Sequence, residues 1–104
     1  MPDLDAIPEE TARRAKFIYI NYPNNPTGAV ATKAFYEKLV AWAKTYEVGV
    51  VSDLAYGALG YQGYENPSFL STPGAKDVGI EFYTFSKTFN MAGWRLAFAA
   101  GNDR

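Results

Sequence analysis

The sequence predicts an α/β fold with a partial, mostly parallel sheet of three parallel strands and one antiparallel strand. Three observations support this prediction. Strand-like runs at 17–21 and 48–52 flank a stretch with helical periodicity, which is the pattern of a βαβ unit. A third run lies at 80–85. A fourth run, at 95–100, follows it too closely for the crossover connection that a parallel strand needs.

The size and composition of the chain argue against several classes of function. The chain has 104 residues, of which 48% are hydrophobic and 20% charged, so we treat it as a single globular segment. Ten basic against eleven acidic residues, without a basic cluster, argue against nucleic-acid binding. No membrane span or secretory signal is visible, so we expect no membrane association and a cytoplasmic location.

The absence of cysteine and histidine excludes several kinds of site. Disulfides, zinc sites built from Cys or His, and Ser-His or Cys-His catalytic pairs are all ruled out, and we expect no metal site. Any chemistry must therefore come from Lys, Asp, Tyr, Asn, Ser, Thr and Arg side chains.

The first half of the chain predicts a lead-in, a strand and a helix. Residues 1–16 are polar and interrupted by proline, so we expect at most one exposed helical turn there. The strand at 17–21 is rich in β-branched and aromatic residues and stops at a turn-rich loop. The helix starts at Thr32 as N-cap and runs to about Tyr46. Its expected apolar stripe consists of four residues: Phe35, Leu39, Trp42 and Tyr46.

The second half predicts three further strands. The run at 48–52 is uniformly apolar, which favours a buried parallel strand ending at Asp53. Residues 57–79 hold five glycines and two prolines and predict a long irregular connection with room for one helical turn. A tight loop at 86–93 should then join the strand at 80–85 to the antiparallel strand at 95–100.

Polar side chains follow the ends of all three predicted parallel strands. Asn25, Asp53 and Tyr56 come after the first two strands, and Ser86 and Lys87 after the third. Each has an ordinary explanation by itself, since such residues are common in turns and solvated loops. Together they bring an amide, a carboxylate, a phenol and an amine to the edge where open α/β sheets bind ligands.

Three sequence blocks in this order resemble the signature blocks of pyridoxal-phosphate-dependent aminotransferases of fold type I, class I/II. The blocks are YPNNPTGA at 22–29, VSDLAYG at 51–57 and TFSKTFNMAGWR at 84–95. The residues of these blocks are similar to those of the branch that contains aspartate, aromatic and LL-diaminopimelate aminotransferases, but they do not distinguish between these substrates. The resemblance implies an internal fragment, namely the C-terminal half of the cofactor-binding large domain, with the N-terminal and small-domain parts absent.

The resemblance implies roles for residues around the cofactor ring. Lys87 would form a Schiff base with the aldehyde of pyridoxal 5'-phosphate and later move a proton. Asp53 would keep the pyridine nitrogen protonated, which makes the ring an electron sink. Tyr56 and Asn25 would hydrogen-bond the phenolate oxygen, and the Asn25–Pro26 bond can be cis in this family.

The resemblance also implies a phosphate site formed by Thr84, Ser86 and Arg95. The implied partners are an amino acid and a 2-oxo acid, with a homodimeric parent protein. Because the resemblance leaves an edge and one or both apolar faces of the sheet without cover, we expect self-association or partial order of this chain. The substrate-carboxylate arginine of the family is among the parts absent, so we expect the chain to be inactive alone.

Two alternatives stay open at this stage. A pyridoxal-phosphate-dependent C–S β-lyase shares these blocks and differs in substrate contacts that the chain lacks. A non-catalytic interaction module would keep the signature without the activity. A nucleotide-binding module has little support, because the loops after residues 21, 53 and 86 contain no glycine-rich phosphate motif.

Overall fold

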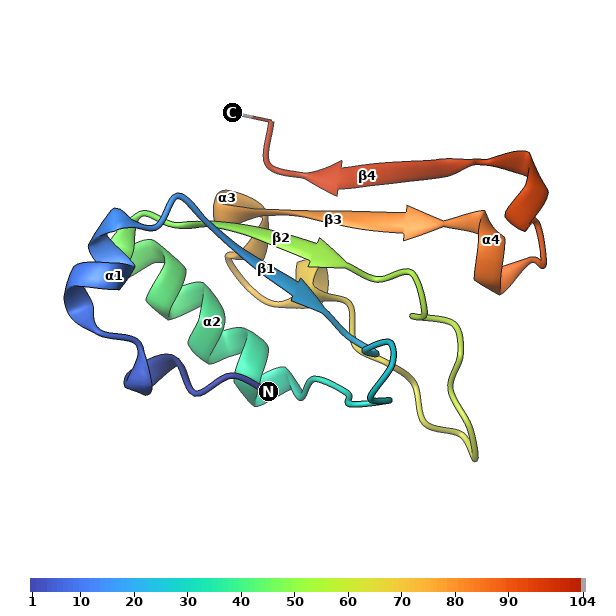
Figure 1. Cartoon of the computed structure of the whole chain (residues 1–104), viewed down its shortest axis with the longest axis horizontal. Coiled ribbons are helices and arrows are strands. Elements are labelled where there is room, and N and C mark those ends of the chain that lie inside the picture. The colour runs from blue at the N-terminus through green and yellow to red at the C-terminus, as the bar shows by residue number, and fades with distance from the viewer. Residues whose placement is uncertain (104) are drawn as a thin grey trace.

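The computed structural model has a four-stranded sheet with the strand order β1, β2, β3, β4 (Figure 1). Strand β1 (Phe17–Asn21) runs parallel to β2 (Gly49–Asp53), and helix α2 (Lys33–Tyr46) connects them. Strand β3 (Gly79–Thr84) is parallel to β2, whereas β4 (Ala97–Gly101) is antiparallel to β3. The predicted fold class, including its single antiparallel pair, is confirmed.

The register of the sheet aligns the ends of the three parallel strands. Asn21 of β1 lies opposite Asp53 of β2, which in turn lies opposite Phe82 of β3. Thr84 at the end of β3 pairs with Ala97 at the start of β4. In Figure 1 the arrowheads of β1, β2 and β3 point the same way, and that of β4 points back. The segments that follow the three parallel strands therefore start from one edge of the sheet.

Helix α2 begins at the predicted cap. Thr32 Oγ1 accepts a hydrogen bond from the backbone N–H of Phe35 at 3.1 Å. Glu47 closes the helix in the left-handed conformation, with a φ of 55°. The structure describes residues 1–103, and no helix in that range has both the length and the apolar character needed to cross a membrane.

The buried face of α2 differs in part from the predicted stripe. Phe35 and Leu39 are buried, but Trp42 and Tyr46 are only half-buried. Three residues beside the predicted stripe complete the buried face: Tyr36, Val40 and Ala43. A helix that covers a sheet buries a face wider than one row of side chains. A stripe of one residue per turn therefore predicts only one side of the buried face.

The hydrophobic core lies between α2 and one face of the sheet. Ile20 of β1 and Val50 of β2 belong to it, together with Leu39 of the helix. The ring of Tyr36 meets the ring of Phe69 edge to face, with 5.7 Å between their centroids. Phe69 is fully buried although it comes from the long connection between β2 and β3. That connection is therefore anchored in the core at its far end.

The connections after β2 and after β3 both contain short helical segments, where the sequence predicted an irregular connection with room for one helical turn at 57–79 and a tight loop at 86–93. The 57–79 connection includes a 3₁₀ turn at Phe69–Ser71 and helix α3 (Ala75–Val78). The predicted tight loop at 86–93 is replaced by helix α4 (Phe85–Thr88) and a 3₁₀ turn at Ala92–Trp94. Thr84 caps α4 by accepting a hydrogen bond from Ser86 N, which ends β3 one residue earlier than predicted. Arg95 has a φ of 51°, so β4 starts only at Ala97.

The N-terminal lead-in is more structured than predicted. A 3₁₀ turn at Leu4–Ala6 is followed by helix α1 (Glu9–Arg14). Leu4 is 2% exposed and contacts the core cluster, and Ala12 is fully buried. Leu4 anchors residues 1–16 in the core, so the expectation of at most one exposed helical turn there was wrong.

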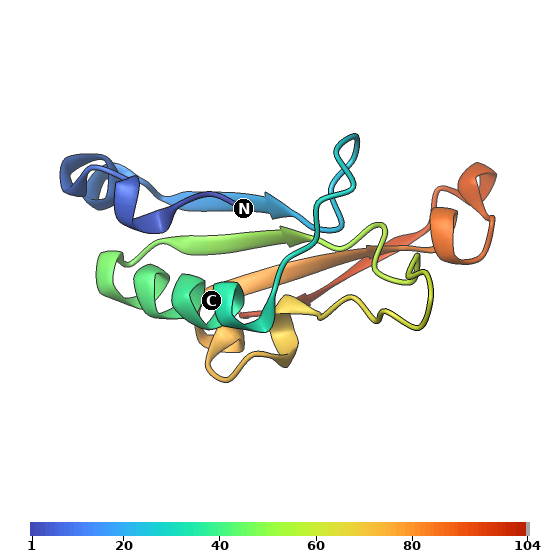
Figure 2. The same cartoon turned by 90° about the horizontal axis from the view of Figure 1, so that it is seen from below.

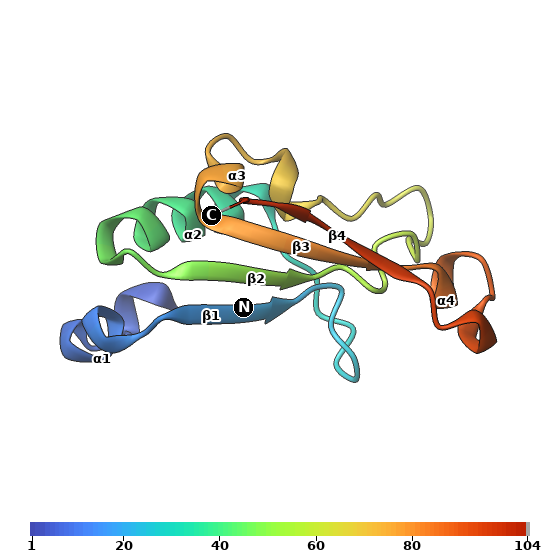
Figure 3. The ribbon, with the colours of Figure 1, turned by 90° about the horizontal axis from the view of Figure 1, so that it is seen from above.

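Only one face of the sheet is covered by helices. Helices α2 and α3 lie on the same side of the strands (Figures 2 and 3). On the opposite side, Phe17 is 72% exposed, Tyr19 65% and Phe82 42%. The prediction that the second strand is buried on both faces holds for Val50 but not for Val51, which is half-exposed. The uncovered face is thus aromatic and apolar, although it meets solvent in this chain.

Candidate active site

The candidate site residues gather where the three parallel strands end. In Figure 2 the loop after β1 extends past β1, away from α2. Tyr19 and Asp53 alternate with the buried Ile20 and Ser52 and therefore face the side of the sheet opposite α2, where Tyr19 Oη donates a hydrogen bond to Asp53 Oδ2 at 3.3 Å. The candidate site is therefore at the carboxyl edge of the sheet, with its Asp53 carboxylate on the uncovered face.

Asn21, the last residue of β1, organises the loop that carries Asn25. Its Oδ1 accepts hydrogen bonds from Asn24 Nδ2 at 3.3 Å and from Asn25 N at 3.2 Å. Its Nδ2 donates to the backbone oxygen of Asp53 at 3.1 Å. Asn21 thereby ties the loop to the end of β2, a role that sequence reasoning missed. The available signal was an asparagine placed at the junction of a strand and a turn-rich loop.

The peptide bond between Asn25 and Pro26 is cis, as the family resemblance implied, and so is the bond between Tyr22 and Pro23. Asn24 Oδ1 accepts a hydrogen bond from Thr27 Oγ1 at 2.7 Å. The loop is thus held by its own side chains as well as by Asn21.

Asn25 and Tyr56 are brought into direct contact from the ends of two strands. Asn25 Nδ2 donates a hydrogen bond to Tyr56 Oη at 3.0 Å. Lys87 Nζ lies 5.8 Å from the centroid of the Tyr56 ring, so the amine of α4 joins the same group. An amide, a phenol and an amine from the segments that follow three strands therefore lie close together at the edge of the sheet.

Asp53 is held by two hydrogen-bond donors. Its Oδ1 accepts from the backbone N–H of Ala55 at 3.0 Å, and its Oδ2 accepts from Tyr19 Oη. Partial burial, followed by the charge of the neighbouring Asp53, raises the pKa of Tyr19, which keeps the phenol protonated as a donor. Sequence reasoning missed Tyr19, because its strand position made it look like a packing residue.

The predicted phosphate residues occupy the corner between β3 and β4 but are less closely connected. Thr84 Oγ1 accepts a hydrogen bond from Ser86 N at 3.1 Å, so these two are adjacent. Arg95 Nη1 donates to the backbone oxygen of Ala92 at 3.0 Å, within its own turn. Within residues 1–103, no hydrogen bond joins the side chain of Arg95 to Thr84 or Ser86.

A cavity of about 620 Å³ adjoins Asn25 and Tyr56. Its walls come from the loop after β1 and from the first part of the 57–79 connection, including Leu59, Tyr61 and Tyr64. From the sequence, Tyr61 was expected to cover the core rather than to contact a ligand, but its side chain is 81% exposed. Leu59 and Tyr64 were not assigned, because the glycine-rich connection has no periodicity from which their orientation could be inferred.

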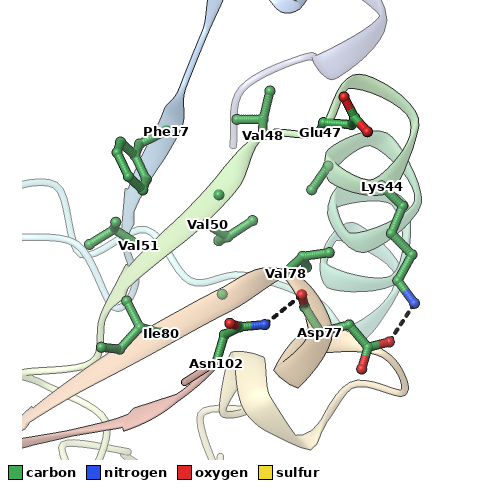
Figure 4. Close-up of a pocket in the computed structure, with 13 residues that line it drawn as sticks. Phe17, Lys44, Glu47, Val48, Val50, Val51, Asp77, Val78, Ile80 and Asn102 are labelled. Atoms are coloured by element: carbon green, nitrogen blue, oxygen red, sulfur yellow. Dashed lines mark hydrogen bonds and ion pairs between the residues drawn. The ribbon is translucent and has the colours of Figure 1, made fainter. Parts of the chain in front are cut away.

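A second cavity, of about 600 Å³, lies at the opposite end of the sheet (Figure 4). It is lined mainly by apolar side chains of β2 and β3 and by Lys44, whose Nζ lies 2.7 Å from Asp77 Oδ2. It contains none of the predicted site residues. The polar groups capable of chemistry are therefore concentrated at the carboxyl edge.

Comparison with known proteins agrees with this geometry. The whole chain, residues 1–104, matches the family described as aminotransferase class I and II. It is 57% identical over 102 residues to LL-diaminopimelate aminotransferase 2 of Nostoc sp. strain PCC 7120, covering 98% of this chain and 26% of that protein. It is 59% identical over 103 residues to LL-diaminopimelate aminotransferase of Aquifex aeolicus, with coverage of 98% and 26%.

A solved structure of substrate-bound BacF from Bacillus subtilis superposes with a TM-score of 0.94 at 51% identity. The match covers 99% of this chain and 26% of that structure. The chain thus spans about a quarter of the length of the curated relatives it matches. On the strength of the match over its full length, the chain belongs to the class I and II aminotransferase family.

Proposed function

We propose that this chain is the C-terminal half of the cofactor-binding large domain of a pyridoxal-phosphate-dependent aminotransferase. The whole protein would move an amino group between an amino acid and a 2-oxo acid. The observation that carries this proposal is the hydrogen bond between Asn25 and Tyr56 beside the amine of Lys87. Family membership and the names of the curated relatives support the same reaction class.

The residues at the carboxyl edge fit pyridoxal 5'-phosphate by the chemistry of their donor set. Asp53 supplies a carboxylate for the ring nitrogen, and the Asn25–Tyr56 pair supplies donors for the phenolate oxygen. Lys87 supplies the amine for the aldehyde. Three residues in the corner after β3 would hold the phosphate: Thr84, Ser86 and Arg95. When bound, the cofactor serves as an electron sink for the α-carbon of the substrate.

Lys87 would supply both the nucleophile and the proton carrier. It sits on α4, which begins directly after β3, so the sheet fixes its backbone. An amine on a flexible four-carbon stem can reach a carbonyl carbon and afterwards take and return a proton at a nearby carbon atom. Its Nζ lies 5.8 Å from the centroid of the Tyr56 ring, which places the nitrogen beside the Asn25–Tyr56 pair.

Asp53 would hold the positive charge at the ring nitrogen. The hydrogen bonds from Ala55 N and Tyr19 Oη fix the orientation of its carboxylate without neutralising it. A fixed carboxylate favours the protonated form of a facing nitrogen base. Asn25 and Tyr56 would add neutral donors at the phenolate oxygen, which stabilises its negative charge.

The chain alone would be inactive. Its site lies on an uncovered face, so it neither excludes water nor holds a substrate from both sides. For the whole protein, we propose an amino acid and a 2-oxo acid as substrates, a homodimeric assembly and a cytoplasmic location. Because the curated relatives are named LL-diaminopimelate aminotransferases, LL-diaminopimelate is the first amino donor to test.

Product analysis of the longer protein tests the reaction class. The protein would be incubated with LL-diaminopimelate, with and without a 2-oxo acid acceptor. We expect that amino-group transfer requires the acceptor, and that the acceptor is converted to its amino acid in a one-to-one ratio. Release of pyruvate and ammonia from a sulfur-containing amino acid without an acceptor would instead indicate the lyase.

A further inference from the structure

Glu81, in the middle of β3, is fully buried, and no step of the proposed function uses it. Its carboxylate accepts four hydrogen bonds. Oε1 accepts from Ser68 Oγ and from Tyr83 Oη, both at 2.5 Å. Oε2 accepts from Ser52 Oγ at 2.9 Å and from the backbone N–H of Phe69 at 2.8 Å. An ionised carboxylate has acceptor positions for all four donors.

Such an arrangement is unusual for the interior of a sheet. A buried carboxylate is costly unless charge-assisted hydrogen bonds compensate for the lost hydration, and an apolar residue of similar size would fill the same space. Burial, and then the hydrogen bond to Glu81, raise the pKa of Tyr83, so that this phenol stays a neutral donor. Unlike an apolar side chain, the carboxylate makes directional hydrogen bonds, and each of these fixes the position of one neighbouring group.

The four donors come from three segments that carry the candidate site. Ser52 directly precedes Asp53 at the end of β2. Tyr83 directly precedes the Thr84 cap, from which α4 and Lys87 start. Ser68 and Phe69 end the stretch of the connection whose first part lines the cavity beside Tyr56. Glu81 is thus hydrogen-bonded to all three segments, and each of its donors lies one to a few residues along the chain from a residue of the candidate site or its cavity wall.

We propose that Glu81 is a positioning residue, which fixes the end of β2, the end of β3 and the cavity wall relative to one another. The identity of the site that it positions rests on the proposed function. The geometric role does not, and it can be tested on the 104-residue chain without cofactor.

Three variants separate positioning from general stability. Glu81→Gln keeps an oxygen for Phe69 N, while its amide can donate to Ser68 Oγ and Tyr83 Oη once these hydroxyls rotate. Ser68→Ala removes one tether and leaves the carboxylate in place. Glu81→Leu leaves the Phe69 N–H buried without an acceptor.

Hydrogen exchange at two ends of the sheet is the measurement. Near the site, Leu54 N donates to Phe82 O at 3.0 Å and Gly57 N to Leu54 O at 3.1 Å. At the far end, Gly49 N donates to Lys16 O at 2.9 Å and serves as the internal reference. We expect Ser68→Ala and Glu81→Leu to speed exchange roughly tenfold or more near the site with little change at the reference. We expect Glu81→Gln to restore near-normal exchange.

Equal acceleration at both ends in Ser68→Ala, or no acceleration near the site, would overturn the proposal. If Glu81→Leu fails to fold, Ser68→Ala and Glu81→Gln still decide it. Trapping of cofactor on Lys87 in the unchanged chain is a separate measurement. Failure of that trapping with the expected exchange pattern would contradict the cofactor site and leave the positioning role of Glu81 intact.

Discussion

The two faces of the sheet differ sharply, although the same strands form both. The face toward α2 is closed by Tyr36, Leu39 and Phe69, and the buried carboxylate of Glu81 on this face accepts hydrogen bonds from four donors. The other face exposes Phe17 and aromatic neighbours to solvent. The covered face therefore stabilises the fold and holds the buried network of Glu81, whereas the Asp53 carboxylate of the candidate site is on the uncovered face. The packing that stabilises the fold and the carboxylate of the candidate site thus lie on different faces of one sheet.

The largest expected effect is on the covered face. Leu39→Ala removes a fully buried side chain from the centre of the core and should lower the free energy of unfolding by about 2–5 kcal/mol. The matched change Phe17→Ala on the uncovered face should cost less than about 1 kcal/mol, because that side chain remains mostly solvated. Urea unfolding followed by circular dichroism measures both. Equal losses would contradict the division between the faces.

The next effect concerns self-association through the uncovered face. Phe17 and Phe82 are large aromatic side chains that a second copy can cover, with a gain of about 2 kcal/mol for each ring removed from water. We expect the unchanged chain to form oligomers in sedimentation velocity, and Phe17→Lys with Phe82→Lys to shift it to monomer. Ala34→Lys on the exposed side of α2 is the control and should leave the oligomers unchanged. A compact monomer of the unchanged chain would refute this prediction.

A smaller difference between the two faces is expected in how the free energy of unfolding changes at alkaline pH. Burial first, and then the charge of Glu81, raise the pKa of Tyr36 on the covered face. A folded-state pKa above the unfolded one gives stability that is present below about pH 10 and lost as pH rises, by about 1.4 kcal/mol per pH unit and tyrosine. Tyr36→Phe should therefore flatten the decline of stability above pH 10, more than Tyr19→Phe does. The reverse order in urea titrations at pH 9 to 11 would contradict the assignment.

The smallest expected effect is at the site itself. Tyr56→Phe removes the hydroxyl that accepts from Asn25 Nδ2, a bond worth about 1 kcal/mol. Titration with pyridoxal 5'-phosphate, followed by absorbance, should give about fivefold weaker binding, since 1.4 kcal/mol corresponds to a factor of ten. Tyr46→Phe, in the last turn of α2 and outside the walls of this cavity, is the matched control and should bind normally. Identical affinities for both variants would remove Tyr56 from the site.

Much of the fold could be predicted because local patterns and burial agree in this chain. The βαβ unit follows from strand-like runs around a capped helix, and the antiparallel last strand follows from a short connection. The lead-in and the β3–β4 corner were mispredicted, since their structure depends on contacts distant in sequence or on single caps. Leu4 contacts the core cluster from far away in the chain, and the Thr84 cap converts a loop into α4.

From the residues alone, the site could be anticipated only as a set of residues at strand ends, and the family resemblance added that Asn25 and Tyr56 share one partner. The contact of Asn25 with Tyr56 requires two loops to meet, which no spacing within one block reveals. Asn21 and Glu81 were missed because both act through hydrogen bonds to other segments, 32 residues away for Asn21 with Asp53 and 29 for Glu81 with Ser52. Sequence patterns identify groups that carry chemistry more readily than the groups that hold them in place.

Trapping of the cofactor on lysine tests the proposed site most directly. The chain would be incubated with pyridoxal 5'-phosphate and reduced with borohydride, and the modified lysines would be located by mass spectrometry. The loop contacts around Tyr56 predict preferential labelling of Lys87, lost in Lys87→Ala and retained in the matched control Lys76→Ala. Even labelling of the other lysines, Lys16, Lys33, Lys38, Lys44 and Lys76, with no preference for Lys87, would contradict the proposed site.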